Sequence, residues 1–385
     1  MNKKDFEQIK FGKLIWESKG MYYRFEPSTL PLNFKSDLKI GALSIRTAIL
    51  LGRLDGLTRH LSNDEIDLLR IPFIMKEARL SSEIEGTRST LSDVYKEDKI
   101  KEKNPRKRED NEEIRNYAEA LNYGLNNIEN GISEDLLKSI HIILLKGVRG
   151  YSKDPGEYKI SQNAVGDRQD TLDTAKFVPA SPDTTPVLMK NFIGYLNDSG
   201  EQENIISKIA IVHYQFEAIH PFRDGNGRIG RLLITLLLVR KGILSHPLLY
   251  ISEYLNRNRS TYTDLLYEVS SKGKINNWIN FFLNALINQV ERSLKLIEKL
   301  EKYKKEMQKD IESVTQSHRM YKVVDLVFKN PFLSIKDVSD TLGMSIPGAS
   351  KIVHKLEQKN ILKEITGKKS RKIFVAEKIL EILEE

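Results

Sequence analysis

The chain contains 385 residues, of which 40% are hydrophobic and 30% are charged, and its formal net charge is +8. This length allows two or three domains with a sizeable core, and the composition is that of a soluble protein. The absence of cysteine excludes disulfides and thiolate metal sites. No apolar run reaches the roughly 18 residues that a membrane span needs, and the start contains no signal-peptide core. We therefore expect a cytoplasmic protein with no membrane partner, whose positive charge permits nucleotide or nucleic-acid binding without requiring it.

The first third of the sequence predicts helices after an opening segment, residues 1–39, that we expect to be irregular or short-stranded. Apolar residues recur at helical spacing from Ile40 to Leu61 and again from Asp64 to Ser82. The second stretch ends close to Gly86, which is a suitable residue for a helix C-cap. The charges then crowd together from Lys96 to Glu113, where we predict a solvated linker.

Two more helices and a hairpin are predicted in the middle of the chain. The helices cover Ile114–Gly124 and Ser133–Leu145, and Ser133 is a suitable N-cap for the second. His141 falls on the apolar face of that helix, so we interpret it as a packed core histidine. The helical period disappears between Gly156 and Pro186, and alternation around a polar tip predicts a β-hairpin there.

The densest concentration of polar chemistry lies between His220 and Arg231, which read His-Pro-Phe-Arg-Asp-Gly-Asn-Gly-Arg-Ile-Gly-Arg. The flanking stretches, Ile205–Ile219 and Leu232–Val239, are apolar enough to predict buried helices. These twelve residues therefore form a polar joint between two helices.

The residue types in this joint indicate an anion site. Gly225, Asn226 and Gly227 precede the second helix, where free N–H groups and the positive end of the helix dipole form a cradle for anions. Arg228 and Arg231 are three residues apart, so they share one face of that helix. Their forked donors suit phosphate oxygens.

Two further side chains supply what phosphate chemistry needs. Asp224 requires a cation if it lies among phosphates, and Mg²⁺ held by one carboxylate and by phosphate oxygens is the usual solution. His220 can accept a proton from an attacking hydroxyl near neutral pH. The joint therefore predicts phosphate-transfer chemistry on a magnesium nucleotide.

The same residues resemble, position for position, the active-site motif of the Fic family, which is His, any, Phe, any, Asp or Glu, Gly-Asn-Gly-Arg, two residues, Arg. Most members transfer the AMP of ATP onto a hydroxyl side chain of a protein. The resemblance therefore implies a protein adenylyltransferase with His220 as the base, Asp224 on Mg²⁺ and residues 225–231 on the phosphates of ATP. It also implies a Fic-type helical bundle over roughly residues 30–290, and the self-association of family members makes a homodimer a further expectation.

The stretch before residue 87 resembles the inhibitory helix of the same family, whose pattern is Ser or Thr, three residues, Glu, then Gly or Asn. Ser81, Glu85 and Gly86 fill this pattern. The resemblance implies that Glu85 pairs with Arg231 and places a carboxylate where the terminal phosphate of the nucleotide belongs. An ordinary surface carboxylate near a helix end is the alternative.

The family resemblance extends to two weaker features. The hairpin segments 156–166 and 177–179 resemble the flap that lays the target backbone beside the active site by strand addition; a mere surface excursion is the alternative. A helix is predicted over Leu248–Leu266, and the family pattern implies that Tyr254 and Asn258 contact the adenine. An aromatic stripe that belongs to the core is the alternative for these two.

The composition changes again near residue 315, after a charged helix. Helices are predicted over Tyr321–Phe328, Ser334–Leu342 and Pro347–Lys359, and strand-like runs follow within Ile361–Val375. This order resembles a winged helix, with the third helix as the reader and a basic hairpin as the wing. The side chains that we expect to meet DNA phosphates are Lys351, His354, Lys355, Lys368, Lys369 and Arg371. A dimerisation or protein-docking module is the alternative.

The sequence therefore predicts a mainly α protein, a Fic-type helical bundle with a β-hairpin flap and a C-terminal winged-helix domain. The predicted parts are an N-terminal region with the inhibitory helix (1–110), the catalytic core (111–290), a helical linker (291–314) and the winged helix (315–385). The leading function is transfer of AMP from ATP to a Tyr, Ser or Thr hydroxyl of a protein, including the chain itself, with Glu85 as the inhibitor. The alternatives are removal of AMP from a modified protein and a nucleotide-sensing DNA-binding regulator.

Overall fold

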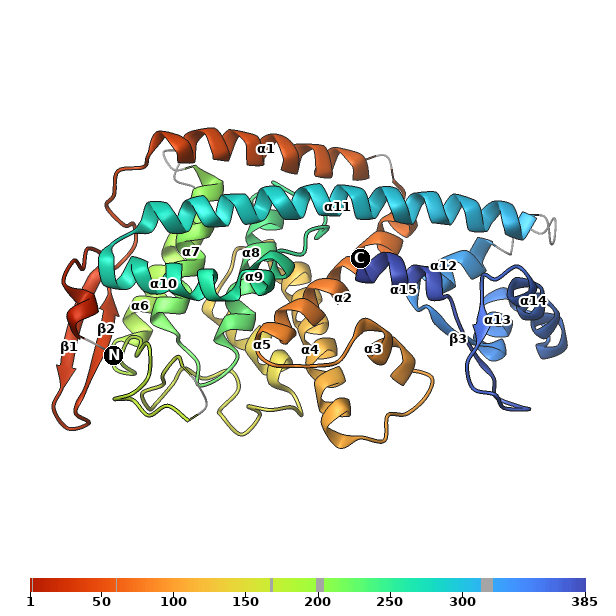
Figure 1. The fold of residues 1–385 in the computed structure, drawn as a ribbon, viewed down its shortest axis with the longest axis horizontal. Coiled ribbons are helices and arrows are strands. Elements are labelled where there is room, and N and C mark those ends of the chain that lie inside the picture. Colours follow the sequence, from red (N-terminus) through yellow and green to blue (C-terminus); the bar gives the residue numbers. More distant parts are fainter. Residues whose placement is uncertain (2, 60, 167–168, 199–203, 313–320) are drawn as a thin grey trace.

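The structure of the chain is a computed structural model that describes residues 1, 3–59, 61–166, 169–198, 204–312 and 321–385. It is mainly helical, as predicted. Figure 1 shows a long helix, α11, along the longest axis, with α1 outside it and the helical bundle on its other side. A small hairpin lies at one end of the molecule and the C-terminal elements lie at the other.

The helices before α11 form the bundle. In chain order they are α1 (Leu38–Thr58), α2 (Asn63–Ile84), α3 (Leu91–Glu97), α4 (Pro105–Asn127), α5 (Glu134–Leu145), α6 (Thr185–Asn197), α7 (Ile205–Ile219), α8 (Asn226–Arg240), α9 (Ser252–Arg257) and α10 (Arg259–Lys272). The predicted N-cap of α5 is confirmed, because the side chain of Ser133 accepts a hydrogen bond from the N–H of Leu136 at 3.0 Å. No helix within the described part of the chain is long and apolar enough to cross a membrane.

The opening segment is short-stranded, as predicted. After a 3-10 helix, η1 (Lys3–Phe6), strands β1 (Gly12–Glu17) and β2 (Tyr22–Pro27) pair antiparallel. The N–H of the buried Phe25 in β2 donates to the carbonyl of Val178 at 2.8 Å. The hairpin therefore bonds to the second segment of the predicted flap, residues 177–179.

The start of α4 corrects one prediction. Residues 96–113 were expected to form a linker, but a helix begins at Pro105. The side chain of Asn104 accepts from the first two free N–H groups of the helix, and Pro105 occupies the first turn, where its missing N–H costs nothing. The many charges around these two residues led to the prediction of a linker, although Asn104 and Pro105 are typical of a helix start. The predicted boundary at residue 110 consequently falls inside a continuous helix.

The helix α11 (Ile275–Glu312) is the axis of the molecule. It has 38 residues and packs against α1, α7 and α10. Near its beginning, the buried indole of Trp278 donates from Nε1 to the carbonyl of Ala210 in α7 at 2.7 Å. The predicted linker, residues 291–314, is helical as far as Glu312 because it is the second half of α11. The predicted boundary at residue 290 also lies inside this helix.

The C-terminal elements follow the predicted order of three helices and two strands, and they add a strand, β3, and a last helix, α15. They are α12 (Tyr321–Lys329), β3 (Phe332–Ser334), α13 (Ile335–Leu342), α14 (Ile346–Gln358), β4 (Lys363–Glu364), β5 (Ile373–Val375) and α15 (Glu377–Glu384). The strands form an antiparallel sheet in the order β3-β5-β4. The side chain of Ser334 caps α13 by accepting a hydrogen bond from the N–H of Asp337. The additional helix, α15, packs against α11.

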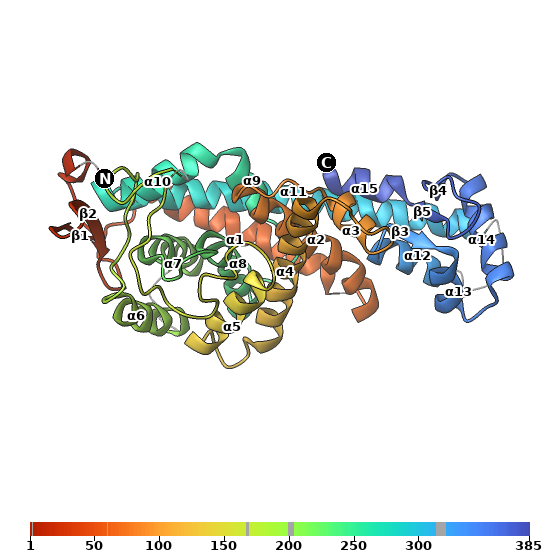
Figure 2. The same cartoon turned by 90° about the horizontal axis from the view of Figure 1, so that it is seen from below.

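These C-terminal elements are packed onto the first helices of the chain. Helix α12 contacts α2, and α15 contacts α3; Figure 2 shows α3 beside this end of the molecule. The Lys99 ammonium lies 2.8 Å from the Asp337 carboxylate, and the amide of Asn330 donates to Asp98 at 3.0 Å. The C-terminal part therefore touches the helices on both sides of residue 85.

Trp278 provides a test of the central role of α11. Its replacement by alanine is expected to lower the free energy of unfolding by about 3 to 5 kcal/mol, because a large cavity forms between α7 and α11. Denaturant unfolding measures this loss. The only other tryptophan, Trp16, is 48% exposed and packs at a tilt against the ring of Tyr23. Trp16→Ala should cost no more than about 1.5 kcal/mol, the typical value of such a ring contact. Equal losses of unfolding free energy in the two variants would contradict the central role of α11 and its Trp278.

Candidate active site

The polar joint connects α7 and α8 through two residues in the left-handed region. His220 ends α7 with φ of 50°, and its N–H donates to the carbonyl of Phe216 at 2.8 Å. Gly225 precedes α8 with φ of 77°. The left-handed conformation is costly for a residue with a side chain, so the fold holds His220 in it at an expense of about 1 to 2 kcal/mol. Such strain is typical of functional positions.

Two asparagines hold the backbone of the joint. The carboxamide of Asn226 accepts from the N–H of Phe222 at 2.9 Å and donates to its carbonyl at 2.7 Å. From the predicted flap, Asn163 donates to the carbonyls of His220 and Phe222 at 3.1 and 2.8 Å. Asn226 was predicted as part of the anion cradle. Its carboxamide bonds to the backbone of Phe222 inside the joint, and these bonds fix the backbone that forms the cradle.

The buried His141 also supports the backbone of the joint. The N–H of Gly156 donates to Nδ1 at 2.8 Å, so the proton is on Nε2, which donates to the carbonyl of Asp224 at 3.0 Å. Burial lowers the pKa of His141 to about 4, so the ring is neutral at physiological pH. The prediction of a core histidine is confirmed. The ring also positions Asp224, which no pattern in the sequence indicates.

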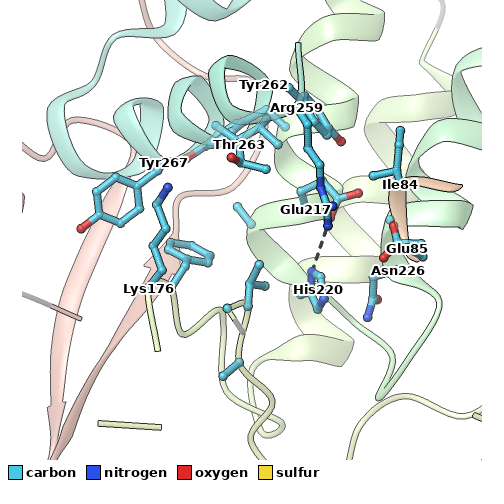
Figure 3. A pocket seen from close by; sticks show the side chains of 18 of the residues that line it. Ile84, Glu85, Lys176, Glu217, His220, Asn226, Arg259, Tyr262, Thr263 and Tyr267 are labelled. Atoms are coloured by element: carbon cyan, nitrogen blue, oxygen red, sulfur yellow. Dashed lines mark ion pairs between the residues drawn. The ribbon is translucent and has the colours of Figure 1, made fainter. Parts of the chain in front are cut away.

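A cavity of about 710 Å³ opens in front of the joint (Figure 3). Its walls come from the end of α2, the predicted flap, α7, the joint, α8 and α10. Side chains on these walls include Glu85, Lys176, Glu217, His220, Asn226, Arg231, Arg259, Tyr262, Thr263 and Tyr267. The cavity therefore contains a histidine, carboxylates and several cations, which is a composition suited to an anionic substrate.

The guanidinium of Arg231 is buried and bonded to the end of α2. It donates to Ser81 through Nε to Oγ (2.8 Å) and through Nη2 to the carbonyl (3.0 Å). Nη2 also donates to Oε1 of Glu85 at 2.6 Å. Burial lowers the pKa of Arg231, but Glu85, Tyr262 and Glu217 together outweigh this effect and raise it above its ordinary value. The structure therefore brings Ser81, Glu85 and Arg231 together.

Two glycines permit this contact. A Cβ atom on Gly227 would lie 2.4 Å from Oε1 of Glu85, so only glycine lets the carboxylate approach the N-terminus of α8. Gly86 has φ of 100°, a conformation that favours glycine and that ends α2 directly after Glu85.

Glu217 belongs to the site and was missed by the sequence reasoning. Its Oε2 lies 3.5 Å from Nδ1 of His220 (dashed line in Figure 3), and both side chains are largely buried. Burial raises the pKa of Glu217, but His220, His213 and Arg231 together outweigh this effect and lower it, so the carboxylate is ionised. The available signal was the spacing, since an acid three residues before a histidine on one helix lies on the same face.

Asp224 and Arg228 form the outer part of the joint. Asp224 accepts from the N–H of Gly225 at 2.7 Å and lies 2.8 Å from the ammonium of Lys153. Burial raises its pKa, but Lys153 and Arg228 outweigh this effect and lower it. Arg228 lies 3.5 Å from Asp224 and does not line the cavity, whereas Gly225, Asn226, Gly227 and Arg231 do. Two buried guanidinium nitrogens of Arg228, Nε and Nη1, have no hydrogen-bond partner among the described residues.

The N-terminus of α8 fits an anion, and Asp224 fits a single magnesium ion. No side chain caps α8, so its first N–H groups are available for a ligand. Among the described residues no group of three or more His, Asp or Glu could hold a metal. A magnesium ion at Asp224 would therefore take its other ligands from phosphate and water, which is its usual arrangement beside nucleotides.

The predicted flap is present, but its pairing is short. Val165 and Phe177 exchange backbone hydrogen bonds of 2.8 and 3.1 Å, and in the described parts of residues 156–186 the pairing is limited to this bridge. Both residues line the cavity. Ile160, in the same segment, is 80% exposed.

The two residues predicted for adenine do not reach the cavity. The predicted helix is broken at Asn258, whose amide donates to the carbonyl of Tyr254 at 2.9 Å, and the ring of Tyr254 packs against Phe281. The cavity wall is formed instead by the next helix, α10. Its contributing residues are Arg259, Ser260, Tyr262, Thr263, Leu266, Tyr267 and Ser270. They recur at spacings of three and four, and this recurrence was the signal available in the sequence.

The buried Lys159 joins the flap to the end of α7. Its ammonium donates to the carbonyl of Ile219 at 3.0 Å and to Oδ1 of Asn163 at 2.9 Å. Burial lowers the pKa of Lys159 from 10.5 to about 7. The bond to Asn163 orients the amide that supports His220, so this lysine contributes to the shape of the joint.

Comparisons with known proteins bear on this site. The model of the Fic/DOC family matches residues 131–238, and the model of the Fic/DOC family N-terminal region matches residues 43–126. A probable protein adenylyltransferase of Aquifex aeolicus is 37% identical over 94 residues, which are 24% of this chain and 27% of that protein. The protein adenylyltransferase Fic of Culex quinquefasciatus is 33% identical over 144 residues, 37% of this chain and 24% of that protein. The chain thus matches about a quarter of the length of these relatives.

Solved structures show the same fold. A Fic family protein from Desulfovibrio desulfuricans superposes with a TM-score of 0.56 at 20% identity and covers 89% of this chain and 97% of that one. A Fic domain containing signaling protein from Bacteroides thetaiotaomicron gives a TM-score of 0.50 at 24% identity, with coverage of 67% and 94%.

The pKa of Lys159 predicts how stability depends on pH. Between about pH 7 and 10.5 the unfolded chain holds a proton on this lysine that the folded chain has lost, so its contribution to the free energy of unfolding rises with pH. The difference between wild type and Lys159→Met is therefore expected to grow between about pH 7 and 9.5 in denaturant unfolding. Lys190→Met, at an exposed position, is the control, and its difference should stay constant. If the difference in free energy of unfolding between wild type and Lys159→Met does not change with pH, the lowered pKa of Lys159 is contradicted.

Proposed function

The chain belongs to the Fic/DOC family, and from this premise we propose that it is a protein adenylyltransferase. It would move the AMP of ATP onto a Tyr, Ser or Thr hydroxyl of a protein, including a hydroxyl of its own chain. The observation that supports this most directly is one cavity that contains His220, the uncapped N-terminus of α8 and the guanidinium of Arg231. A volume of about 710 Å³ lies in the usual range for pockets that bind small molecules.

In this proposal His220 is the general base. Glu217 is next to Nδ1, so it holds the proton on that nitrogen and leaves Nε2 free to accept a proton from the attacking hydroxyl. The hydroxyl oxygen forms a bond to the α-phosphorus of ATP, and the bond from that phosphorus to the pyrophosphate oxygen breaks. The catalytic side chains form no covalent bond to phosphorus, so positioning and electrostatic stabilisation supply the acceleration.

The anion site would stabilise the departing pyrophosphate. The first N–H groups of α8 and the guanidinium of Arg231 lie where negative charge would collect. Asp224 would hold Mg²⁺, because its carboxylate is ionised and lies on the cavity wall. A bound magnesium ion neutralises phosphate charge. Lys153, which is 2.8 Å from this carboxylate, would have to move aside.

In this proposal Glu85 would inhibit the enzyme by taking the place of a nucleotide phosphate. Its carboxylate occupies the partner position on Arg231 that a nucleotide phosphate needs, and it lies against Gly227 at the N-terminus of α8. A charge-assisted hydrogen bond of this kind contributes about 1.5 to 3 kcal/mol. The same carboxylate also supports the alternative activity, removal of AMP from a modified protein, in which it would orient a water molecule.

The C-terminal part favours a second candidate function, DNA binding. Its order of helices and strands is that of a winged helix, with α14 as the third helix and the turn between β4 and β5 as the wing. The side chains of Lys351, His354 and Lys355 on α14 are exposed, as are those of Lys368 and Lys369 on the turn. Exposed basic residues on these two elements suit the phosphates of a duplex. A nucleotide-sensing regulator is therefore the runner-up.

Transfer from α-labelled ATP with Mg²⁺ to the purified protein and to a cell lysate tests the proposed activity. Glu85→Gly is expected to raise the transfer by roughly 10- to 150-fold, the equivalent of the lost bond. Adding His220→Ala should abolish it. Glu83→Gly is the matched control, because Glu83 is also an acid at the end of α2 but pairs with Arg79. If nucleotide binds and no variant transfers label, the proposal fails in favour of AMP removal or the regulator.

A separate measurement tests the DNA-binding candidate. The double change Lys368→Glu and Lys369→Glu is expected to weaken binding to a random-sequence duplex and to reduce its salt dependence by about one unit of slope for each lost phosphate contact. Fluorescence anisotropy at several salt concentrations gives both values. Lys302→Glu with Lys305→Glu, on the exposed side of α11, changes the charge equally and should have no such effect. Equal weakening by both pairs would contradict a specific role for the wing.

A further inference from the structure

Glu113 of α4 is a buried carboxylate at which three segments of the chain meet. It is only 1% exposed, and a carboxylate in such a place is costly unless donors surround it. The hydroxyl of Thr87, from the segment after α2, donates to Oε2. The guanidinium of Arg149, from the segment after α5, donates to Oε1 at 2.8 Å and to Oε2 at 2.9 Å. None of these three residues takes part in the proposed catalytic steps.

Thr87 belongs to the hydrogen-bonded end of α2. Its N–H donates to the carbonyl of Ser82 at 3.2 Å, and the N–H of Glu85 donates to the same carbonyl at 3.0 Å. Only Gly86 separates Thr87 from Glu85, and the side chain of Thr87 is buried. A displacement of Thr87 is therefore passed through one residue to the carboxylate on Arg231.

The next residue is tied to α4 in the same way. The N–H of Arg88 donates to Oδ2 of the buried Asp110 at 3.0 Å, and Asp110 lies three residues before Glu113 on α4. The hydrogen bonds of Glu113 raise the pKa of Arg149, and the charge of Asp110 adds to this effect, so one guanidinium neutralises both acids. Helix α4 lies beside α2 (Figures 1 and 2). Two consecutive residues after Gly86 are thus fixed to α4.

The pair between Glu85 and Arg231 tolerates little displacement of this segment. Oε1 of Glu85 lies 2.6 Å from Nη2 of Arg231, and a Cβ atom on Gly227 would lie 2.4 Å from the same oxygen. A shift of about 1 Å would lengthen the bond past the roughly 3.2 Å that N–H···O bonds span. The Glu85 side chain is 39% exposed, so water competes for its oxygens. The position of its backbone therefore decides how much of the pair is formed.

We propose that Glu113 is a positioning residue for this inhibitory pair, an inference that rests on the proposed function of Glu85. Bound to Thr87 and neutralised by Arg149, Glu113 holds the chain directly after α2. The carboxylate of Glu85 then stays against the guanidinium of Arg231. Loss of the Thr87 bond lets the end of α2 shift, so that a nucleotide phosphate competes better for the arginine. A residue that acts in this way has no effect once Glu85 is removed.

Label transfer from α-labelled ATP with Mg²⁺, together with equilibrium titration of ATP, tests the bond between Thr87 and Glu113. Thr87→Val removes the hydroxyl and keeps the branched shape. It is expected to raise transfer and ATP affinity by about tenfold, the lower end of the value of a hydrogen bond to a charged group. Thr87→Ser keeps the hydroxyl and should behave as wild type. Thr58→Val is the matched control, because Thr58 is equally buried but donates to the carbonyl of Asp55 at the end of α1.

The same changes in a Glu85→Gly background separate positioning from a merely structural role. There Thr87→Val should add nothing, because the carboxylate that it positions is absent. Glu113→Gln, which removes the charge that holds both donors, should likewise raise transfer only when Glu85 is present. A loss of transfer in both backgrounds would identify a structural role and overturn the inference.

The failure of this inference differs from the failure of the proposed function. If Glu85→Gly raises transfer and Thr87→Val does not, the positioning role of Glu113 is wrong and the inhibition by Glu85 stands. If no variant transfers label, Glu85→Gly included, the proposed function is wrong. The ATP affinities then decide the inference, and equal affinities of wild type and Thr87→Val would overturn it.

Discussion

The buried guanidinium of Arg231 is the constraint on which the site depends. A charge with almost no exposure is costly unless other groups bind it, and the removal of a partner from such a pair costs several kcal/mol. Here the partners are Ser81 and Glu85 from the end of α2. The charge therefore fixes α2 against α8, and it does so with the same donors that a phosphate would use. Under the proposed function, inhibition and nucleotide binding would be alternatives at one cation, so each would weaken the other.

The position of Glu85 is also connected to the opposite end of the molecule. Just after it, Thr87 bonds to the buried Glu113, which the forked donors of Arg149 hold at 2.8 and 2.9 Å. Farther along, α3 is tied to the C-terminal elements through Lys99, and α12 packs on α2 itself. The segment that places the carboxylate in the cavity is therefore held between the catalytic bundle and the C-terminal part.

Local signals made much of this structure predictable, and long-range packing explains what they missed. Helices with amphipathic spacing and capped starts, such as the one capped by Ser133, depend on neighbours in sequence. The helix that begins at Pro105 was missed because a run of charges normally indicates exposure, yet Glu113 within it is buried as the partner of Arg149. Similarly, the adenine-side prediction chose Tyr254 from α9, whereas the bend at Asn258 turns α10 toward the cavity. Such choices depend on contacts between distant segments, which spacing alone does not encode.

The walls of the cavity come from elements that are distant in sequence, so the site depends on the packing of the whole bundle. They are the end of α2, the predicted flap, α7, α8 and α10. Glu85 and Arg231 are 146 residues apart in the chain and meet because α2 packs against α8. A displacement of the end of α2 from α8 would therefore separate this carboxylate from the guanidinium.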